Sequence, residues 1–425
     1  MKVLGLMSGT SLDGIDAALL EVEERVDVPR QQTFFPELMA EPGLLLRHSG
    51  WGVGPGAPSL GWDLVAFHTR PFTEIERATT QDAIGSGGAR DLTLLHTRLG
   101  EWFAAAALDL LERAGVPPRE VAALGSHGQT LWHEPPRDGV RGSSFQLGCP
   151  ATLAERTGIG VVSDFRARDL AAGGHGAPLV PWADRVLFSS EEGPRALQNL
   201  GGMGNVTWLP RAGDPAPVLA FDTGPGVVLL DAAAAMAMGG ACTFDRDGEL
   251  ASRGSVRRGV LDRLMAHPFF RQAPPRSTGR EMFGPSMVEE AARELEEESG
   301  ATLEPGVPDE GWPDLLATFA ALTARCIGDA YRRWVLPRGV DEVFIMGGGA
   351  RNPVLFSAIA QELAPVPVRS GEALGMDPDA REAAAFALLA WAHLKGIPAN
   401  VPEATGSQGP RVLGSWTPGR AGGEP

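Results

Sequence analysis

Two apolar runs near the N-terminus, residues 3–7 and 15–20, flank a loop at 8–14 that contains small hydroxylated residues and two glycines. The runs predict two strands joined by a tight connection. Because nothing bulky blocks the loop, its backbone N–H groups and hydroxyls could approach phosphate oxygens. Asp13 and Asp16 could hold Mg²⁺ directly or through water. From this loop alone, an ordinary turn rich in turn formers is an equal alternative.

The same pattern returns in the second half of the chain, where apolar runs at 196–200 and 206–209 surround a glycine-rich loop at 201–205. Strands and helices alternate elsewhere, which favours an α/β fold. Two hairpin loops in two halves predict an internal duplication with a cleft between lobes. Further strands are predicted at 121–124, 159–163, 218–221 and 342–346, helices at 101–114, 152–157, 227–238, 314–336 and 381–394, and a Gly- and Pro-rich loop at 41–62.

Composition excludes several classes of function. The net charge of −16, from 37 basic and 53 acidic residues, argues against a nucleic-acid-binding surface. No apolar run approaches the roughly 20 residues of a membrane span, and the N-terminus lacks a secretory pattern. Cys149, Cys242 and Cys326 are widely separated, so neither a disulfide framework nor a zinc site is expected. A cytoplasmic protein is the natural expectation.

Lysine is nearly absent. Only Lys2 and Lys395 occur, and the chain contains no GxxxxGK[ST] loop and no interior strand lysine of the kinase type. A chain of this composition that binds nucleotide phosphates must therefore use backbone amides, hydroxyls, arginine and metal ions.

Four glycine-containing turns follow predicted strands, at 8–14, 201–205, 222–226 and 347–349. Their distribution over both halves favours convergence on a nucleotide, although such connections often contain glycine for structural reasons. Asp222 ends a predicted strand and precedes a helix, where α/β sites collect ligands, so it could be a general base or a Mg²⁺ anchor. Gly224 and Gly226 would leave room for phosphate. A helix N-cap is less favoured, because the cap should fall near Gly224 or Pro225.

Two other clusters leave alternatives open. His127 and His133 lack a third zinc ligand at suitable spacing, so a substrate contact or a structural role is favoured over metal binding. Arg166 and Arg168 could bind a carboxylate-bearing substrate through paired hydrogen bonds. They could equally form salt bridges with the neighbouring Asp164 and Asp169.

Nine motifs together resemble the anhydro-N-acetylmuramic acid kinase family, and they follow the family's order over nearly the whole chain. They are Gly5-Leu-Met-Ser-Gly-Thr-Ser-Leu-Asp-Gly14, Gly125-Ser-His-Gly-Gln-Thr130, Asp164-Phe-Arg166 with Asp169, Gly176-Ala-Pro-Leu-Val-Pro181, Asn199-Leu-Gly-Gly-Met-Gly-Asn205, Phe221-Asp-Thr-Gly-Pro-Gly226, Phe244-Asp-Arg-Asp-Gly248, Ser277-Thr-Gly-Arg-Glu281 and Gly347-Gly-Gly-Ala-Arg-Asn352. The resemblance implies the actin-like ATPase and sugar kinase superfamily, with two RNase H-like lobes around an ATP cleft. We expect one lobe from residues 1–161 plus 384–425 and the other from residues 162–383.

The resemblance also implies an activity. Members of the family use ATP and Mg²⁺ to open the 1,6-anhydro ring of anhydro-N-acetylmuramic acid and phosphorylate O6, giving N-acetylmuramic acid 6-phosphate and ADP in peptidoglycan recycling. O6 is an ether oxygen without a proton, so a base must instead activate water to attack C1. A cytoplasmic homodimer with a small-molecule substrate is implied. The alternatives are a kinase for an ordinary amino-sugar hydroxyl and an actin-like nucleotide switch.

Site residues carry over by resemblance. Asp222 is expected to be the base, and Asp13 and Asp16 the metal residues. The sugar is expected to contact Thr130, Asp164, Arg168 and Glu382. The nucleotide is expected to contact Ser8, Gly9, Thr10, Ser11, Leu12, Asp13, Gly14, Ile15, Asp16, Gly201, Gly202, Asn205, Gly224, Gly347, Gly348, Gly349 and Asn352. Departures from the family pattern are small; His175 replaces a glutamine, and Thr223 stands where cysteine is common.

Overall fold

The computed structural model describes residues 1–9, 12–25, 48–53, 59–137, 139–309 and 311–420. The chain divides into two compact units. Unit 1 comprises Met1–Ser189, Ala212–Val218 and Gly375–Pro425, and unit 2 comprises Ser190–Arg211 and Leu219–Leu374. Residues 162–189 and 375–383 thus group with unit 1, whereas the sequence prediction assigned them to the second lobe. Two features account for this grouping: β7 pairs with β5 of unit 1, and the helix from Ala380 to Leu394 is continuous.

Unit 1 is built on a mixed sheet. Its strands are β1 (Lys2–Ser8), β2 (Gly14–Arg25), β3 (His48–Val53), β4 (Ser59–Pro71), β5 (Val121–Glu134), β6 (Ser143–Leu147), β7 (Val161–Ser163) and β13 (Ser415–Thr417). Within the described residues their order is β13-β7-β5-β1-β2-β4-β3, with β6 paired to β5. The β1–β2 hairpin is antiparallel, and β5 and then β7 continue parallel to β1.

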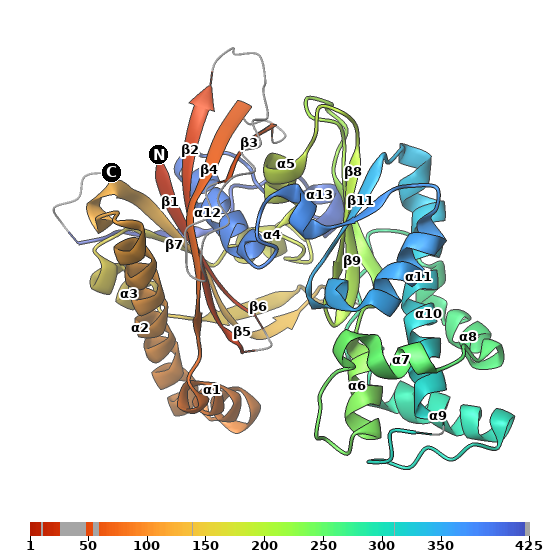
Figure 1. Ribbon diagram of the computed structural model, residues 1–425. Helices are drawn as coiled ribbons and strands as arrows, with labels where there is room; N and C mark the ends of the chain where they lie inside the picture. Colours follow the sequence, from red (N-terminus) through yellow and green to blue (C-terminus); the bar gives the residue numbers. More distant parts are fainter. Residues whose placement is uncertain (10–11, 26–47, 54–58, 138, 310, 421–425) are drawn as a thin grey trace. The chain divides into compact units, whose positions relative to one another are not determined.

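Helices cover both faces of this sheet. The described helices of unit 1 are α1 (Glu74–Ser86), α2 (Ala89–Ala114), α3 (Pro150–Thr157), α4 (Ala167–Ala171), α5 (Pro181–Phe188), α12 (Ala380–Leu394) and α13 (Pro402–Thr405), of which α2 and α12 make the most extensive contacts with the sheet. Because side chains alternate along a strand, Leu4 and Leu6 share the core cluster with the apolar face of α2, while Gly5 faces α12. A Cβ at Gly5 would lie 1.8 Å from the Ala383 carbonyl oxygen, so only glycine permits this close packing of α12 on β1 (Figure 1).

Unit 2 contains a second, smaller sheet. Its strands are β8 (Arg195–Leu200), β9 (Met203–Leu209), β10 (Leu219–Pro225), β11 (Glu342–Met346) and β12 (Val368–Ser370), in the order β10-β9-β8-β11-β12. Its helices are α6 (Val228–Ala237), α7 (Glu249–Arg253), α8 (Arg258–Met265), α9 (Pro285–Ser299), α10 (Trp312–Ala330) and α11 (Pro353–Leu363). The long α10 packs against α6, α11 and β10, with most of its side chains buried (Figure 1).

The two sheets share one topology. In unit 2, β8 and β9 form an antiparallel hairpin, β10 adds antiparallel to β9, and β11 and β12 continue parallel to β8. In unit 1 the strands β4-β2-β1-β5-β7 repeat this order and these directions. The predicted α/β fold with an internal duplication is confirmed.

Several sequence predictions were wrong in detail. The stretch 41–62 was predicted to be a loop, yet 48–53 and 59–62 belong to the strands β3 and β4, because the backbone of β4 pairs with both β2 and β3 and such pairing tolerates a Gly-rich sequence. Residues 41–47 and 54–58 lie outside the described residues. The strand predicted at 121–124 extends to Glu134, since β6 supplies a partner. The helix predicted at 314–336 ends at Ala330 and continues as a π-helical turn. No helix in the described ranges is long and apolar enough to span a membrane.

Candidate active site

The loop predicted to hold phosphate lies in unit 1 between β1 and β2. Ser8 is buried, and its hydroxyl donates to Gln129 Oε1 at 2.8 Å and lies 3.0 Å from the Gly14 carbonyl oxygen. The Leu12 amide bonds to the Gly9 carbonyl, and Arg77 Nε donates to the Leu12 carbonyl at 3.0 Å. The flanks of the loop are therefore fixed by the protein itself. Thr10 and Ser11, which were predicted to bind the nucleotide, lie outside the described residues.

The two predicted metal residues occupy different environments. Asp13 is exposed and lies 3.7 Å from an Arg77 guanidinium nitrogen. Asp16 and Ile15 lie in β2, and Asp16 Oδ1 accepts a 2.6 Å hydrogen bond from the Thr69 hydroxyl. Burial, aided by three nearby carboxylates and opposed by the Thr69 hydrogen bond, raises the pKa of Asp16 to about 6. No group of three or more His, Cys, Asp or Glu side chains that could hold a metal occurs among the described residues.

One of the carboxylates near Asp16 is Glu382, a predicted sugar residue in the first turn of α12. Its side chain reaches solvent, yet its position among protein groups removes enough water from the carboxyl to raise its pKa. The charges of Arg381 and Arg166 oppose this rise. The preceding Arg381 forms a buried ion pair with Asp184 of α5. The structure therefore brings together a predicted metal residue and a predicted sugar residue from two distant parts of the chain.

The arginines after β7 do not pair with their neighbouring aspartates. Arg166 donates to the Gly176 carbonyl at 2.7 Å and to His127 Nε2 at 2.8 Å. Asp169 Oδ2 accepts from the Gly176 amide at 2.8 Å, so both side chains fix one glycine turn. Arg168 is exposed, and within the described ranges it has no ion-pair partner. Of the two arginines, Arg168 is the one left available for a carboxylate ligand.

The two histidines of β5 are neutral groups. Because His127 Nε2 accepts from Arg166, the ring proton lies on Nδ1 and bonds to the Gly128 carbonyl at 2.9 Å. Burial and the Arg166 charge lower the pKa of His127 to about 3 and that of His133 to about 4. On the same strand, the Thr130 hydroxyl accepts a 3.5 Å hydrogen bond from Gln146. Asp164, an exposed predicted sugar residue, has a left-handed backbone (φ 55°) after β7.

In unit 2, the turn at Gly201 and Gly202 packs against the start of α6. The amides of Gly226, Val227 and Val228 donate to the carbonyls of Gly201 and Gly202 at 2.9–3.1 Å. A Cβ on Gly226 would lie 2.1 Å from the Gly201 oxygen. Gly226 was expected to leave room for phosphate, and in the structure its small size permits this backbone contact.

The turn after β11 joins the same group of loops. Gly347 is left-handed (φ 79°), and a Cβ on Gly349 would lie 2.7 Å from Val227, whereas a Cβ on Gly348 would meet nothing within 4 Å. Asn352 caps α11, because its side-chain oxygen accepts from the Val354 and Leu355 amides at 3.1 Å. Gly348 therefore presents an open backbone surface beside the Gly201 turn.

Asp222 lies inside β10, paired with Asn205 of β9, rather than at the end of the strand as predicted. A β-bulge between Asp222 and Gly224 (φ 144°) interrupts the ladder. The Thr278 amide donates to Asp222 Oδ2 at 2.8 Å. Burial raises the pKa of Asp222 to about 6, with the Thr278 hydrogen bond and the Arg276 charge opposing this rise. The carboxyl is thus ionised at neutral pH and is a stronger base than an ordinary aspartate.

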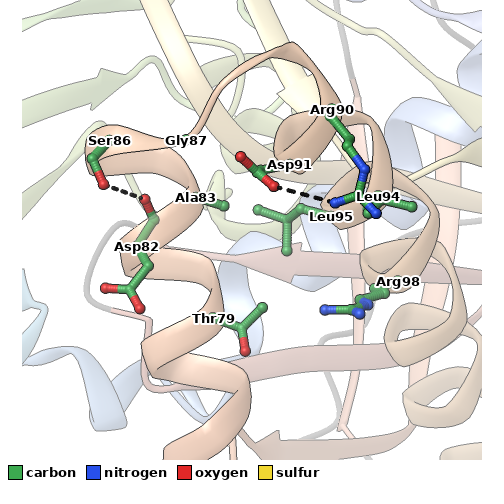
Figure 2. Close-up of a pocket in the computed structure, with 10 residues that line it drawn as sticks. All are labelled: Thr79, Asp82, Ala83, Ser86, Gly87, Arg90, Asp91, Leu94, Leu95 and Arg98. Carbon is green, nitrogen blue, oxygen red and sulfur yellow. Dashed lines mark hydrogen bonds and ion pairs between the residues drawn. The ribbon is translucent and has the colours of Figure 1, made fainter.

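A hollow between α1 and α2 contains none of these residues. Figure 2 shows that Arg90, Asp91 and Arg98 line it from α2, with Thr79, Asp82 and Ser86 on α1. Its arginines are balanced by acidic groups, and no residue predicted for nucleotide or sugar lies in it.

Residues 62–419 match the family model described as anhydro-N-acetylmuramic acid kinase. The chain belongs to the anhydro-N-acetylmuramic acid kinase family. A relative of that name from Gloeobacter violaceus is 42% identical, with 98% of each chain covered. Another, from Caldanaerobacter subterraneus subsp. tengcongensis, is 39% identical over 97% of this chain and 96% of the relative. The chain is therefore an enzyme of the kinase class.

Solved structures that resemble the chain are more distant in sequence. A ROK hexokinase from Thermus thermophilus is 16% identical, covers 92% of this chain and 99% of its own, and has a TM-score of 0.39. An activator of 2-hydroxyisocaproyl-CoA dehydratase from Clostridium difficile with bound ADPNP is 13% identical, covers 93% of this chain and 96% of its own, and has the same score.

Sequence reasoning missed two residues of this anhydro-N-acetylmuramic acid kinase family member, Arg276 and Thr278. Both contact Asp222 from a segment more than fifty positions away. The motif Ser277-Thr-Gly-Arg-Glu281 was among those that carry the resemblance, but no role was assigned to it. The available signal was a polar, glycine-containing stretch outside any predicted helix or strand.

Proposed function

We propose that this enzyme uses ATP to convert 1,6-anhydro-N-acetylmuramic acid and water to N-acetylmuramic acid 6-phosphate and ADP. Asp222 accepts a proton from the attacking water, whose oxygen bonds to C1. The C1–O6 bond breaks, and O6 bonds to the γ-phosphorus as the bond to ADP breaks. The observation that carries the proposal is the buried Asp222 carboxyl, one oxygen of which is held by the Thr278 amide.

The residues proposed for the nucleotide are taken unit by unit. In unit 1 they are the backbone and side chains from Ser8 to Asp16. In unit 2 they are the turns at 201–202 and 347–349, with Asn205, Gly224 and Asn352. Supporting this, Gly347 and Gly349 pack against Leu200, which immediately precedes the turn at 201–202, and Gly348 leaves its backbone open. Backbone amides in glycine turns suit phosphate oxygens where no lysine is available.

Asp13 and Asp16 are proposed to hold Mg²⁺ together with the phosphates. Their oxygen donors fit the ion's chemistry, and two carboxylates completed by phosphate and water suit Mg²⁺ better than an all-protein cage. When bound, Mg²⁺ neutralises charge that develops on the phosphates. The hydrogen bond from Thr69 restricts the orientation of the Asp16 carboxylate, whereas the exposed Asp13 side chain can reorient.

For the sugar, we propose contacts from Thr130, Asp164, Arg168 and Glu382. Arg168 is exposed and free to pair with a carboxylate, and the substrate carries one on its lactyl group. Because ATP is the phosphoryl donor, we place the reaction in the cytoplasm, in the recycling of cell-wall sugars. A homodimer remains a prediction from the family resemblance.

The experiment that tests this proposal compares three conditions: ATP with the anhydro-sugar, ATP with N-acetylmuramic acid, and ATP alone. ADP release is followed by a coupled assay, and the sugar product by mass spectrometry. We expect sugar 6-phosphate and rapid ADP release only with the anhydro-sugar. Equal turnover of N-acetylmuramic acid would instead indicate an ordinary hydroxyl kinase, and ATP hydrolysis independent of sugar would indicate a nucleotide switch.

Asp222→Asn tests the assignment of the base. The amide is nearly isosteric but cannot accept the proton, so kcat should fall by about 10²–10⁴-fold while ATP affinity is retained. The control is Asp262→Asn, an exposed aspartate of α8, which should have normal kinetics. Turnover near the wild-type level in Asp222→Asn would exclude Asp222 as the base.

A further inference from the structure

The segment 276–278 forms hydrogen bonds with both the main chain and the side chain of Asp222. Arg276 Nε donates to the Asp222 carbonyl at 2.9 Å, and the Asp222 amide donates back to the Arg276 carbonyl at 3.1 Å. The Thr278 amide donates to Oδ2 of the carboxylate at 2.8 Å. No other protein donor reaches the Asp222 carboxylate within the described part of unit 2, so Oδ1 is free. The Thr278 hydrogen bond thus determines which carboxylate oxygen is available, and the two bonds with Arg276 fix the main chain of Asp222.

Arg276 is itself fixed in place. Its side chain is buried, and one terminal nitrogen donates to the Gln272 carbonyl at 2.9 Å and lies 3.4 Å from the carbonyls of Phe269 and Phe270. The guanidinium also lies over two aromatic rings, 5.2 Å from the centre of Phe221 and 4.8 Å from that of Phe269. A planar group held by several acceptors and two rings has little freedom to rotate.

Other titratable groups surround this guanidinium, and among them the buried Cys326 thiol is neutral because burial raises its pKa. Cys326 and Asp329 face it from α10, Arg333 from the π-helical turn, and Asp222 from β10. Arginine keeps its charge throughout the accessible pH range, so a permanent cation lies beside the Asp222 backbone. That charge opposes the effect of burial on the pKa of Asp222.

We propose that Arg276 is a positioning residue for Asp222, which fixes the β10 bulge and the Thr278 amide so that Oδ2 is occupied and Oδ1 is presented to water. The inference rests on the proposed function, because it assumes that Asp222 is the base. Arg276 does not touch the reacting atoms in this scheme. It acts by restricting the carboxylate to one orientation and by keeping it ionised near neutral pH.

The test compares Arg276→Gln and Arg276→Lys with Arg333→Gln as a matched control, since Arg333 faces the same cluster without contacting Asp222. In Arg276→Gln, kcat should fall by roughly 10–100-fold while KM for ATP changes less than about twofold, because orientation is lost and binding is kept. The acidic limb of the kcat profile should move upward by about one pH unit. In Arg276→Lys the acidic limb of the kcat profile should stay at its wild-type pH, because the positive charge remains. Only part of the wild-type kcat should be retained, because the planar guanidinium is lost.

A second measurement does not depend on catalysis. The Asp222 carboxyl is titrated by NMR in protein labelled with ¹³C at the aspartate carboxyl, with its resonance assigned by comparison with Asp222→Asn. We expect the Asp222 titration to move upward in Arg276→Gln and to stay in place in Arg333→Gln. If Asp222→Asn retained turnover, the proposed function would fail, yet this titration would still decide whether Arg276 controls the carboxylate.

Two outcomes would overturn the proposal. One is an unchanged titration and an unchanged pH limb in folded Arg276→Gln. The other is an equal loss of kcat in Arg333→Gln, which would indicate a general packing effect. If Arg276→Gln does not fold, Arg276→Lys decides: normal kcat and an unaltered Asp222 orientation in its crystal structure would refute the positioning role.

Discussion

Arg381 on α12 donates two parallel hydrogen bonds to the carboxylate of Asp184 on α5. Nε lies 2.8 Å from Oδ1, and a terminal nitrogen lies 2.5 Å from Oδ2. Asp184 is fully buried and Arg381 is 8% exposed. The pair joins two helices of unit 1 and fixes the first turn of α12, which also carries Glu382.

Replacing Asp184 by Asn should strongly destabilise the protein. The change leaves the Arg381 charge buried without a counterion, and breaking a buried pair in this way costs about 3–5 kcal/mol. Urea denaturation followed by circular dichroism measures the loss. The control is Arg113→Gln, which removes the half-exposed Arg113–Asp109 pair of α2 and should cost less than about 1 kcal/mol. Equal losses of unfolding free energy in the two variants would show that the buried pair contributes no more to stability than the half-exposed one.

The rate of turnover should depend on the ionisation of Asp222. Burial raises its pKa to about 6, so the base is ionised above that pH and protonated below it. We expect kcat to be level above about pH 7 and to fall by about tenfold per pH unit on the acidic side. His127 and His133, with pKa values lowered to about 3 and 4, cannot produce this limb. A kcat profile flat down to pH 5 would contradict the assignment.

Asp231 on α6 offers a test of how burial affects stability. Burial raises its pKa from 3.8 to about 6, with the Asp245 charge adding and the Arg280 charge opposing. A raised carboxyl pKa means that this group's contribution to stability is present below about pH 3.8 and is lost as the pH rises through 6. Asp231→Asn should therefore stabilise the protein at pH 8, by about 1 kcal/mol after allowing for partial exposure, but not at pH 3.5. Denaturation at pH 8 and at pH 3.5 measures the difference in unfolding free energy between Asp231→Asn and the wild type. A gain in stability of the same size at both pH values would show that ionisation is not the cause.

A substitution at Gly348 tests contact with the nucleotide without disturbing the fold. A Cβ there meets nothing within 4 Å, so Gly348→Ala should fold normally. If ATP approaches this turn closely, the added methyl group should raise KM for ATP by roughly tenfold, since a lost close contact is worth about 1–2 kcal/mol. Gly85→Ala in α1 is the control; its Cβ is equally unobstructed, and it should gain a little stability without altering KM. An unchanged KM in Gly348→Ala would place the nucleotide elsewhere.

The duplicated hairpins were predictable because the signal is local. Each consists of two short apolar runs around a glycine loop, and the structure has β1–β2 and β8–β9 at those positions. The strands in 48–53 and 59–62 were not predictable, because β4 is held by pairing with β2, a strand distant in sequence, and β3 in turn pairs with β4. Local composition there, rich in glycine and proline, indicates only a loop.

In the candidate site, too, some residues could be predicted from the sequence and others could not. Asp222 could be singled out because a carboxylate beside a glycine turn is visible in sequence. Its partners Arg276 and Thr278 could not, since only folding brings that segment to β10. Likewise, the pattern around Arg166 and Arg168 left ligand binding and salt bridges equally plausible. The structure places Arg166 on His127 and the Gly176 carbonyl, a contact that no spacing rule predicts.

The glycines that allow α12 to lie on the unit 1 sheet have a consequence for biosynthesis. Gly5 and Gly125 contact the backbone of a helix that the ribosome makes long after both strands. Until α12 emerges, β1, β2 and β5 lack the helix that, among the described elements, packs most extensively on them. We therefore expect unit 1 to complete its folding only near the end of translation, and a chain stalled before residue 380 to be a client for chaperones.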